Sequence, residues 1–308
     1  MSRSILCIGG MALDRKFHLA APLVPASSNP AVQQLSHGGV ARNVAETLTR
    51  LGAHVVLVSR VGKDAAGDAM VSALQACSVD VSAISRDDVL PTAEYVAVLD
   101  FAGELAHGLA AMQVLDQIAA PPDETLRKAA IVFADCNLSA ATLKQLCTIC
   151  GAAGVPLYKD AVSTAKVKRL PEQLDGISAL FLNCDEAAAL TGVPVNGRDG
   201  AIDAHRALAE LGCNSSVISA GAGGVSVYAA GEARLIDVPE MQVVDVTGAG
   251  DALIAGTLLG LEQGLDLYAA ARIGTALAAR TLATAGSIAR DLSPHLAKDL
   301  LAAAKAYA

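Results

Sequence analysis

Short apolar runs and longer amphipathic stretches alternate along the chain. The apolar runs contain mostly Val, Ile, Leu and Ala, and they cover residues 5–8, 55–58, 130–134, 155–158, 179–182 and 216–219. The amphipathic stretches cover residues 40–51, 65–77, 140–153, 199–211, 249–263 and 266–282. Unbroken apolar strands are typical of a mainly parallel sheet that helices cover on both faces. The pattern therefore predicts an α/β fold with such a sheet at its centre.

Two regions depart from this pattern because polar and apolar residues alternate in them. They are residues 16–20 in the first region and residues 92–99 with 104–107 in the second. Alternation with a period of two predicts half-exposed antiparallel strands. We expect strands at approximately 12–20 and 92–108 to form a small second sheet over one end of the main sheet. Ligands of open α/β sheets bind outside the carboxyl ends of the strands, so this small sheet would be a lid.

The charge balance and the scarcity of aromatic residues exclude some partners. The 308 residues include 31 acidic and 23 basic side chains, which gives a formal net charge of −8, and aromatic residues make up 3%. Proteins that bind DNA or RNA concentrate Lys and Arg, and single-strand binders stack bases on aromatic rings. We therefore expect no nucleic-acid partner.

Neither a membrane span nor a disulfide framework is indicated. A spanning helix needs about 20 apolar residues, whereas the best apolar run, residues 252–261, is half as long and contains two glycines. The seven cysteines are an odd number scattered through apolar stretches, which favours reduced thiols and a cytoplasmic location. Cys147 and Cys150 lack the second pair that a zinc site needs, so we expect both to pack as small hydrophobic side chains.

The segment 243–253 carries the most informative motif. It indicates a strand, a glycine turn and a helix that begins near Ala249. Glycines let backbone amides approach an anion closely, and a helix N-terminus adds a positive partial charge. Asp251 either stabilises the helix dipole or acts as a general base that takes a proton from a hydroxyl group. A dinucleotide fingerprint would need glycine in place of Leu253, and the Gly-Lys-Ser/Thr of a P-loop does not occur in the chain.

Two separated motifs are similar to the signatures of the ribokinase-like (PfkB-type) carbohydrate kinases. The first is His-Gly-Gly-Val-Ala-Arg-Asn-Val-Ala at 37–45, and the second is Asp-Val-Thr-Gly-Ala-Gly-Asp at 245–251. Their order and their separation agree with the family over nearly the whole chain. Segments 28–30, 134–139 and 160–166 resemble the bacterial pseudouridine kinase branch of that family.

The resemblance implies a fold, cofactors and partners. The fold is a ribokinase-like three-layer αβα sandwich with a mainly parallel central sheet and a small β lid, in a single kinase domain over residues 1–308. The cofactors are ATP and Mg²⁺, with K⁺ as a further monovalent cation. The partners are a small nucleoside or sugar substrate and a second copy of the chain, which would form a homodimer through the lid.

The resemblance also implies roles for individual residues. Asp251 would be the catalytic base that activates the 5′-hydroxyl group of a sugar, and the amides of Gly248, Ala249 and Gly250 would form an anion hole. The positions that match the sugar-binding residues of the family are Asp14, Gly38, Gly39 and Asn43. The positions that match the nucleotide side are Asn183, Glu186, Ser219, Gly221, Gly224 and Thr247, of which Asn183 and Glu186 would organise Mg²⁺ through water. The loops that match the monovalent-cation site contain Asp245, Val246, Ala285 and Ser287.

Four further residues are candidate substrate contacts. Asn137 comes just after the strand at 130–134, at the carboxyl end that faces the crevice. Lys166 could meet a phosphate or a base, with a solvated helix lysine as the alternative. Thr92 and Tyr95 lie on the predicted lid, where they would close over a base or only pack within the lid.

Three functions stay open at this point. The favoured one is ATP-dependent phosphorylation of the 5′-hydroxyl of a nucleoside, with pseudouridine as the best match to the branch-like segments. The second is a kinase for ribose, a ketohexose or a purine nucleoside, because the sugar-binding positions are shared among these enzymes. The third is a catalytically silent sugar or nucleoside sensor, which the presence of Asp251, Asn183 and Glu186 disfavours.

Overall fold

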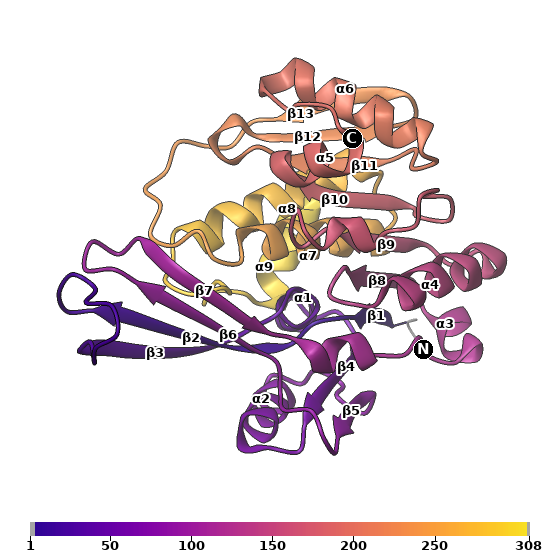
Figure 1. Ribbon diagram of the computed structural model, residues 1–308. Coiled ribbons are helices and arrows are strands. Elements are labelled where there is room, and N and C mark those ends of the chain that lie inside the picture. The colour runs from indigo at the N-terminus through magenta and orange to yellow at the C-terminus, as the bar shows by residue number, and fades with distance from the viewer. Residues whose placement is uncertain (1–3, 307–308) are drawn as a thin grey trace.

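The computed structural model describes residues 4–306, and its centre is a large β-sheet (Figure 1). Within those residues the sheet has nine strands in the order β13-β12-β11-β10-β9-β8-β1-β4-β5. Neighbours from β5 to β11 are parallel, whereas β12 and β13 are antiparallel additions at one edge. The strands are β1 Ile5–Ile8, β4 Val55–Gly62, β5 Ile84–Asp87, β8 Ile131–Asp135, β9 Leu157–Asp160, β10 Ala179–Asn183, β11 Ser216–Ser219, β12 Val225–Ala229 and β13 Glu232–Ile236.

Helices cover both faces of this sheet and complete three layers (Figure 1). One face packs against α1 Val40–Arg50, α2 Ala65–Ala76, α7 Ala249–Glu262, α8 Leu267–Leu282 and α9 Pro294–Lys305. The other face packs against α3 Asp123–Lys128, α4 Ala140–Ala153, α5 Cys184–Thr191 and α6 Gly197–Glu210. The three-layer αβα sandwich is therefore confirmed.

The alternation of side chains along the strands explains how one sheet carries two cores. In β1, for example, Ile5 and Cys7 belong to the cluster under α1 and α7, whereas Leu6 and Ile8 belong to the cluster under α4. Successive side chains of a strand point to opposite faces, so a strand that is covered on both sides needs apolar residues at every position. This is why the strands read as continuous apolar runs in the sequence.

A second sheet projects from the sandwich and forms the lid (Figure 1). Within residues 4–306 it has four strands in the order β3-β2-β6-β7: β2 Ala12–Leu19, β3 Ala31–Gly38, β6 Glu94–Leu99 and β7 Leu105–Ala111. β2 pairs with β6 in parallel, and the two outer pairs are antiparallel. The predicted lid segments are present, and β3 is a lid strand that the hydropathy pattern did not predict. Every residue of β3 from Ala31 to Ser36 is exposed. Because neither face of this part of the strand is buried, its sequence does not alternate between apolar and polar residues.

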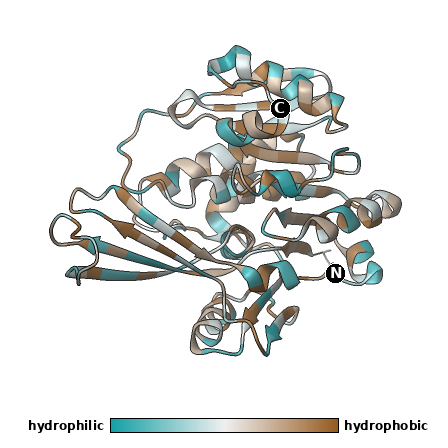
Figure 2. Cartoon of the chain, viewed as in Figure 1, coloured by the Kyte–Doolittle hydropathy of each residue, from teal (hydrophilic) through white to brown (hydrophobic). Residues whose placement is uncertain are grey.

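No helix among residues 4–306 combines the length and the hydropathy that crossing a membrane requires. The hydrophobic residues gather instead inside the strands and on the sheet-facing sides of the helices (Figure 2).

Candidate active site

Polar residues end four neighbouring strands of the central sheet. Asp135, Asp160, Asn183 and Ser219 are the last residues of β8, β9, β10 and β11, which are parallel neighbours in that order. The carboxyl ends of parallel strands open onto one crevice. Three of these residues, together with Asp251 of α7, line a single cavity of about 270 Å³ at this edge.

Helix α7 begins at a turn that only glycine fits. Gly248 precedes the helix with φ 79°, and a Cβ atom there would lie 2.1 Å from the carbonyl oxygen of Ser287. A Cβ atom on Gly250 would meet no atom within 4 Å, so the backbone at that position is open to the cavity that it lines. The amides of a first helical turn have no partner within the helix. The three residues of the predicted anion hole, Gly248 to Gly250, thus lie together beside the cavity.

Asp251 is held by a residue 208 positions away in the sequence. The Nδ2 atom of Asn43, in α1, donates a hydrogen bond of 2.6 Å to Oδ2 of Asp251. Burial raises the pKa of the Asp251 carboxyl to about 6, and the carboxylates of Asp135 and Asp14 act in the same direction. The hydrogen bond from Asn43 and the charge of Arg42 oppose this shift. A carboxyl group with this pKa is ionised at neutral pH and can accept a proton there.

Arg42 fixes the orientation of Asn43, and the sequence reading did not identify it. Its Nη1 atom donates to Oδ1 of Asn43 at 2.8 Å and to the carbonyl oxygen of His37 at 3.0 Å, while Nη2 donates to Glu46. With Oδ1 occupied, the amide of Asn43 must turn its Nδ2 atom toward Asp251. Arg42 and Glu46 are only 7% and 3% exposed. In the sequence Arg42 and Glu46 appear only as an i,i+4 pair of opposite charges, which is common on exposed helices, so the fold was needed to identify their role.

Asp135 organises the backbone around the crevice. Its Oδ2 atom accepts hydrogen bonds of 2.9 Å from the amides of Gly10 and Ala41, and its Oδ1 atom accepts one of 2.9 Å from the amide of Asn137. This fully buried carboxyl therefore ties the end of β8 to the turn after β1 and to the first turn of α1. Burial raises the pKa of Asp135, although these three hydrogen bonds oppose the shift.

Asp14 and two glycines meet where the lid joins the sandwich. A Cβ atom on Gly38 would lie 2.1 Å from Oδ2 of Asp14, and one on Gly39 would lie 2.3 Å from the carbonyl oxygen of Gly10. Gly39 also has φ 102° and precedes α1. Both glycines are therefore required by close contacts. Burial raises the pKa of the Asp14 carboxyl to about 6, against the nearby positive charges of Lys16 and Arg42.

The two lid candidates differ in their surroundings. Tyr95 pairs in register with Asp14, so both side chains project from the same face of the lid. Thr92 is 6% exposed, and its hydroxyl donates to Oδ1 of Asp64 at 2.6 Å and accepts from the amide of Gly62 at 3.0 Å. These contacts connect the start of the lid to the loop before α2. Substrate contact by either residue stays a prediction.

Asn137 and Lys166 contact each other although 29 residues separate them. Nζ of Lys166 donates to Oδ1 of Asn137. Burial lowers the pKa of the Lys166 ammonium group, while the charge of Asp135 raises it. A Cβ atom on Gly10 would lie 2.6 Å from Nδ2 of Asn137, which places this pair next to the glycine turn that Gly39 also touches.

The part of the crevice at the ends of β9 and β10 is acidic. Asn183 and Glu186 form a capping box at the start of α5, in which each backbone amide donates at 2.8 Å to the other side chain. Burial raises the pKa of Asp160 well above its usual range, and the carboxylates of Glu186 and Asp251 add to the effect. Asp160 had no predicted role, although a carboxylate at the end of an apolar strand was a usable signal.

No direct metal-ligand cluster accompanies these carboxylates. Within residues 4–306 no three His, Cys, Asp or Glu side chains are arranged to hold an ion. Asn183, Glu186 and Asp160 line one cavity, however, and the carboxylate of Glu186 raises the pKa of Asp160, so a cation between the two would relieve their repulsion. These residues fit a magnesium ion that is bound through water and phosphate oxygens.

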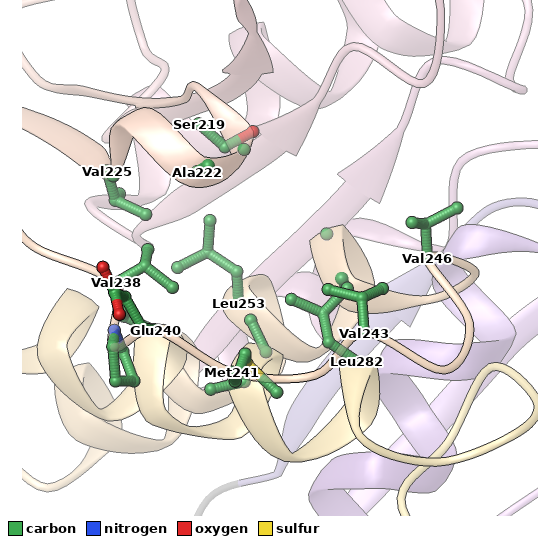
Figure 3. A pocket seen from close by; sticks show the side chains of 18 residues that line it. Ser219, Ala222, Val225, Val238, Glu240, Met241, Val243, Val246, Leu253 and Leu282 are labelled. Carbon is green, nitrogen blue, oxygen red and sulfur yellow. The ribbon is translucent and has the colours of Figure 1, made fainter.

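A larger, mostly apolar cavity of about 580 Å³ adjoins the acidic one (Figure 3). The two cavities share Ser219, Gly250 and Leu253. The lining of the larger cavity comes from the turn after β11, the segment 238–246 and helices α7 and α8. Gly221 and Gly224 lie in that turn with φ 55° and 96°. A Cβ atom on Gly224 would lie 2.6 Å from the carbonyl oxygen of Ile236.

The two predicted cation loops pack against each other. Oδ1 of Asp245 accepts a hydrogen bond of 2.9 Å from the amide of Thr247, and Oδ2 accepts one of 3.1 Å from the amide of Gly286. Burial opposes ionisation of Asp245, but these hydrogen bonds outweigh it and keep the pKa of its carboxyl low. Ala285 and Ser287 flank Gly286, and Val246 is 74% exposed where it lines the larger cavity.

Known proteins share this sequence and this fold. The profile of the pfkB family carbohydrate kinases matches residues 2–294. The pseudouridine kinase of Escherichia coli (strain K12) is 31% identical over 258 residues, which are 82% of this chain and 82% of that protein. The guanosine-inosine kinase of Exiguobacterium acetylicum is 26% identical over 296 residues, which are 91% and 94% of the two chains.

Solved structures agree with this assignment. A carbohydrate kinase from Agrobacterium tumefaciens has a TM-score of 0.84 at 30% identity, with 97% of each chain covered. The ribokinase of Arabidopsis thaliana, complexed with ribose and ATP, has a TM-score of 0.86 at 23% identity, with 98% of this chain and 99% of that chain covered. Since the profile match extends from residue 2 to residue 294, the chain belongs to the pfkB family of carbohydrate kinases, ATP-dependent phosphotransferases that act on a hydroxyl group.

Proposed function

We propose that the protein transfers the γ-phosphoryl group of ATP to the 5′-hydroxyl group of a nucleoside, with pseudouridine as the first candidate. The observation that carries the proposal is the bond from Asn43 to Asp251 at the start of α7, beside the acidic cavity and within the electrostatic reach of Asp14. Asp251 takes the proton of the 5′-hydroxyl group while the hydroxyl oxygen attacks the γ-phosphorus atom, and ADP leaves. The enzyme contributes position and charge stabilisation rather than covalent chemistry.

The roles of the other residues follow from their positions. The amides of Gly248, Ala249 and Gly250 stabilise the charge on the transferred group. The adenosine part of ATP would occupy the apolar cavity between the turn after β11 and helices α7 and α8, and Thr247 would lie beside the triphosphate. Asn183 and Glu186 would hold Mg²⁺ through water, and the bound ion would supply positive charge next to the phosphate groups. Asp14 and the free N–H of Asn43 hold the ribose hydroxyls, since a carboxylate accepts and an amide donates.

Pseudouridine is the first candidate for two reasons. The E. coli pseudouridine kinase is 31% identical to the chain, and the segments 28–30, 134–139 and 160–166 resemble that branch. The Asn137–Lys166 pair also offers an amide and an ammonium group to the carbonyl and N–H groups of a uracil ring. Tyr95 would close over the base from the lid.

The second candidate is a kinase for another nucleoside or for a free sugar. The relatives include the guanosine-inosine kinase and a ribokinase of Arabidopsis thaliana that is 28% identical over 259 residues. Asp14 and Asn43 contact a ribose ring in either case, so they do not discriminate. A silent sensor is disfavoured because Asp251, Asn43 and the glycine turn are all in place.

The test is a comparison of kcat/KM for pseudouridine, uridine, ribose, adenosine and fructose with ATP as donor. We expect pseudouridine to give the highest value. A preference for free ribose or fructose would overturn the nucleoside assignment, and a preference for adenosine would overturn pseudouridine. If none of the five gave ADP above the ATPase background, the sensor would replace the kinase.

K⁺ binding between the loops at 245–247 and 285–287 is part of the proposal. The support is that Asp245 hydrogen-bonds to both loops, so a cation there would connect the anion-hole turn to the segment after α8. Replacing K⁺ by a large organic cation at constant ionic strength is expected to lower kcat.

A homodimer through the outer face of the lid is also proposed. Leu35, Arg15, Val96 and Leu109 follow one another across the four strands, on the face opposite Asp14 and Tyr95. Leu35 and Leu109 are 57% and 62% exposed. Apolar side chains on an exposed sheet face favour association, and light scattering should give twice the chain mass.

A cytoplasmic location is proposed because all seven cysteines are unpaired, and cell fractionation tests it.

A further inference from the structure

A lysine lies in the middle of the apolar layer between β9 and α4. Lys159 is 0% exposed. Its Nζ atom donates hydrogen bonds to the carbonyl oxygen of Leu143 at 2.8 Å and to Sγ of Cys147 at 3.0 Å. In the stretch from residue 4 to residue 306, no carboxylate forms an ion pair with it. The proposed kinase mechanism does not use this lysine.

Four thiols surround Lys159, and one of them differs from the rest. Burial raises the pKa values of Cys150 and Cys213 to about 11, and it raises the pKa of Cys136 further. These three thiols therefore stay protonated and unreactive. Cys147 makes the direct contact with Lys159, and it also lines a cavity of about 580 Å³ between α4 and the segment 171–175. Cys147 is 8% exposed, and this cavity gives a small oxidant a route to it.

The pair brings together two groups that can each act as a nucleophile. The thiolate is the reactive state of cysteine, and the free amine is the reactive state of lysine. The 3.0 Å contact between Nζ and Sγ holds nitrogen next to sulfur, so an electrophilic sulfur at Cys147 would meet the nitrogen of Lys159 first.

We propose that Cys147 and Lys159 form an oxidation-sensitive pair that becomes covalently linked through sulfur and nitrogen. Hydrogen peroxide first oxidises the thiol to a sulfenic acid, with one oxygen atom passing to sulfur and one water released. The nitrogen lone pair of Lys159 then attacks sulfur, the S–O bond breaks, and the hydroxyl group leaves as water with an amine proton. One peroxide is consumed and two waters form, and an added thiol reverses the link.

The link would change the position of residues in the crevice through β9, the strand that carries Lys159. The next residue, Asp160, ends β9 and lines the acidic cavity with Glu186 and Asp251. A covalent S–N bond is much shorter than the 3.0 Å contact, and we expect its formation to draw the end of β9 toward α4. Misplacement of groups near the reacting atoms by a fraction of an ångström lowers turnover, and we expect kcat to fall about tenfold.

Tryptic digestion after peroxide treatment tests the proposal directly. In the reduced protein trypsin cuts after Lys144, Lys159 and Lys166, which gives peptides 145–159 and 160–166. A linked Lys159 resists cleavage, so we expect a peptide 145–166 that is two hydrogens lighter than its sequence. A disulfide between Cys147 and Cys150 would instead give a lighter 145–159 with normal cleavage, and this outcome would overturn the proposal.

Variants separate the pair from other oxidation. Cys147→Ser and Lys159→Met should both abolish the linked peptide, whereas Cys150→Ser, on the same helix, should retain it. The fall in kcat should accompany the linked peptide, be reversed by dithiothreitol and be absent in Cys147→Ser. The proposal fails if Cys147 goes only to the sulfinic acid, or if the linked protein keeps its kcat. Mass and cleavage are read without any substrate, so this test does not depend on the proposed kinase reaction.

Discussion

The two walls of the crevice differ in how their carboxylates are held. On the wall formed by the sandwich, Asp251 is hydrogen-bonded to a neighbouring side chain. On the wall formed by the lid, the carboxylate of Asp14 has no such partner among the described residues. Asp251, Asn43 and Arg42 form a chain of hydrogen bonds that continues to buried Glu46. Asp14 lies across from them on β2, and no hydrogen bond to its carboxyl group is found within residues 4–306. Both carboxyls have pKa values of about 6, but only Asp251 has its position fixed by partners.

The difference separates two tasks. Groups that act on the reacting atoms gain from being fixed before substrate arrives, because no reorganisation is then needed during the reaction. A group that binds substrate needs free hydrogen-bonding capacity instead. The exposed outer strands β3 and β7 give the lid few buried contacts of its own, which is typical of elements that close over ligands. We therefore expect changes on the sandwich wall to lower kcat and changes on the lid wall to raise KM.

The largest effect is expected for Asp251→Asn. Asparagine keeps the shape but cannot take the hydroxyl proton, so kcat should fall at least ~10²-fold while ATP still binds. Steady-state assays and nucleotide titration measure the two quantities. The pKa of Asp251 is raised from 3.8 to about 6 in the folded protein, so its protonated form stabilises the fold. This contribution is full below pH 3.8 and is lost as pH rises through 6. The variant should therefore melt no lower than wild type at pH 8. Activity within tenfold of wild type would remove Asp251 from the catalytic role.

Asp14→Asn should act on the other wall. Loss of a charged acceptor for a ribose hydroxyl removes a bond that contributes about 1.5–3 kcal/mol, so kcat/KM should fall about 10- to 100-fold. Most of the fall should appear as a higher KM for the acceptor, with KM for ATP unchanged. Glu94→Gln, on the neighbouring lid strand, is the control and should change neither constant by more than about twofold. A pure kcat effect of Asp14→Asn would contradict the division between the walls.

The pH profile distinguishes the two carboxyls. Both must be ionised, so kcat/KM should fall below pH 6, by about tenfold per unit for each group that titrates. The slope of log kcat/KM against pH should approach about two in the wild type and about one in Asp14→Asn. Because Asp14 adds to the burial that raises the pKa of Asp251, the remaining limb should also move to lower pH. Identical profiles for the two proteins would show that Asp14 does not titrate with activity.

Arg42→Lys should weaken the sandwich wall without removing its charge. Lysine cannot bond to Asn43, His37 and Glu46 at once, so Asn43 loses its fixed orientation and kcat should fall about tenfold. The weaker bond to Asp251 should raise its pKa, which moves the acid limb to higher pH. Arg50→Lys is the matched control, because Arg50 pairs with the same Glu46 at 2.5 Å but does not touch Asn43. Equal effects of both substitutions would show that Arg42 acts only on stability.

The sequence predicted the sandwich better than it predicted the relations across the crevice. The strands at 5–8 and 216–219 and the helix at 140–153 agree with the structure to the residue. Burial on both faces leaves a continuous apolar signal, and α4 also has Ser139 and Gly154 at its ends. The edge strands β5, β12 and β13 and the helices α3, α5 and α9 were not predicted. The helix at 199–211 was displaced by up to two residues, because Gly197 and Arg198 carry no helix-start signal.

The residues of the candidate site were named from the family resemblance, whereas the contacts among them are known only from the fold. The contact between Asn43 and Asp251 spans 208 residues, and no local pattern records such a distance. Arg42 and Lys159 were missed because each reads as an ordinary basic residue until its neighbours are known. Cys147 was interpreted as a small hydrophobic side chain, and its contact with Lys159 adds chemistry that spacing alone did not show.

The smallest effect is expected for Tyr95→Phe, and it tests the lid wall most finely. Tyr95 projects from the same lid face as Asp14, and a neutral hydroxyl bond to a base contributes about 0.5–1.5 kcal/mol. KM for the acceptor should therefore rise about threefold, with kcat within twofold of wild type. Val96→Ala, the next residue on the same strand, projects from the outer face and is the matched control, with KM unchanged. Since ribose has no base, KM for ribose should be the same in Tyr95→Phe and wild type. A rise for ribose as large as that for pseudouridine would mean that Tyr95 supports the lid rather than contacts the base.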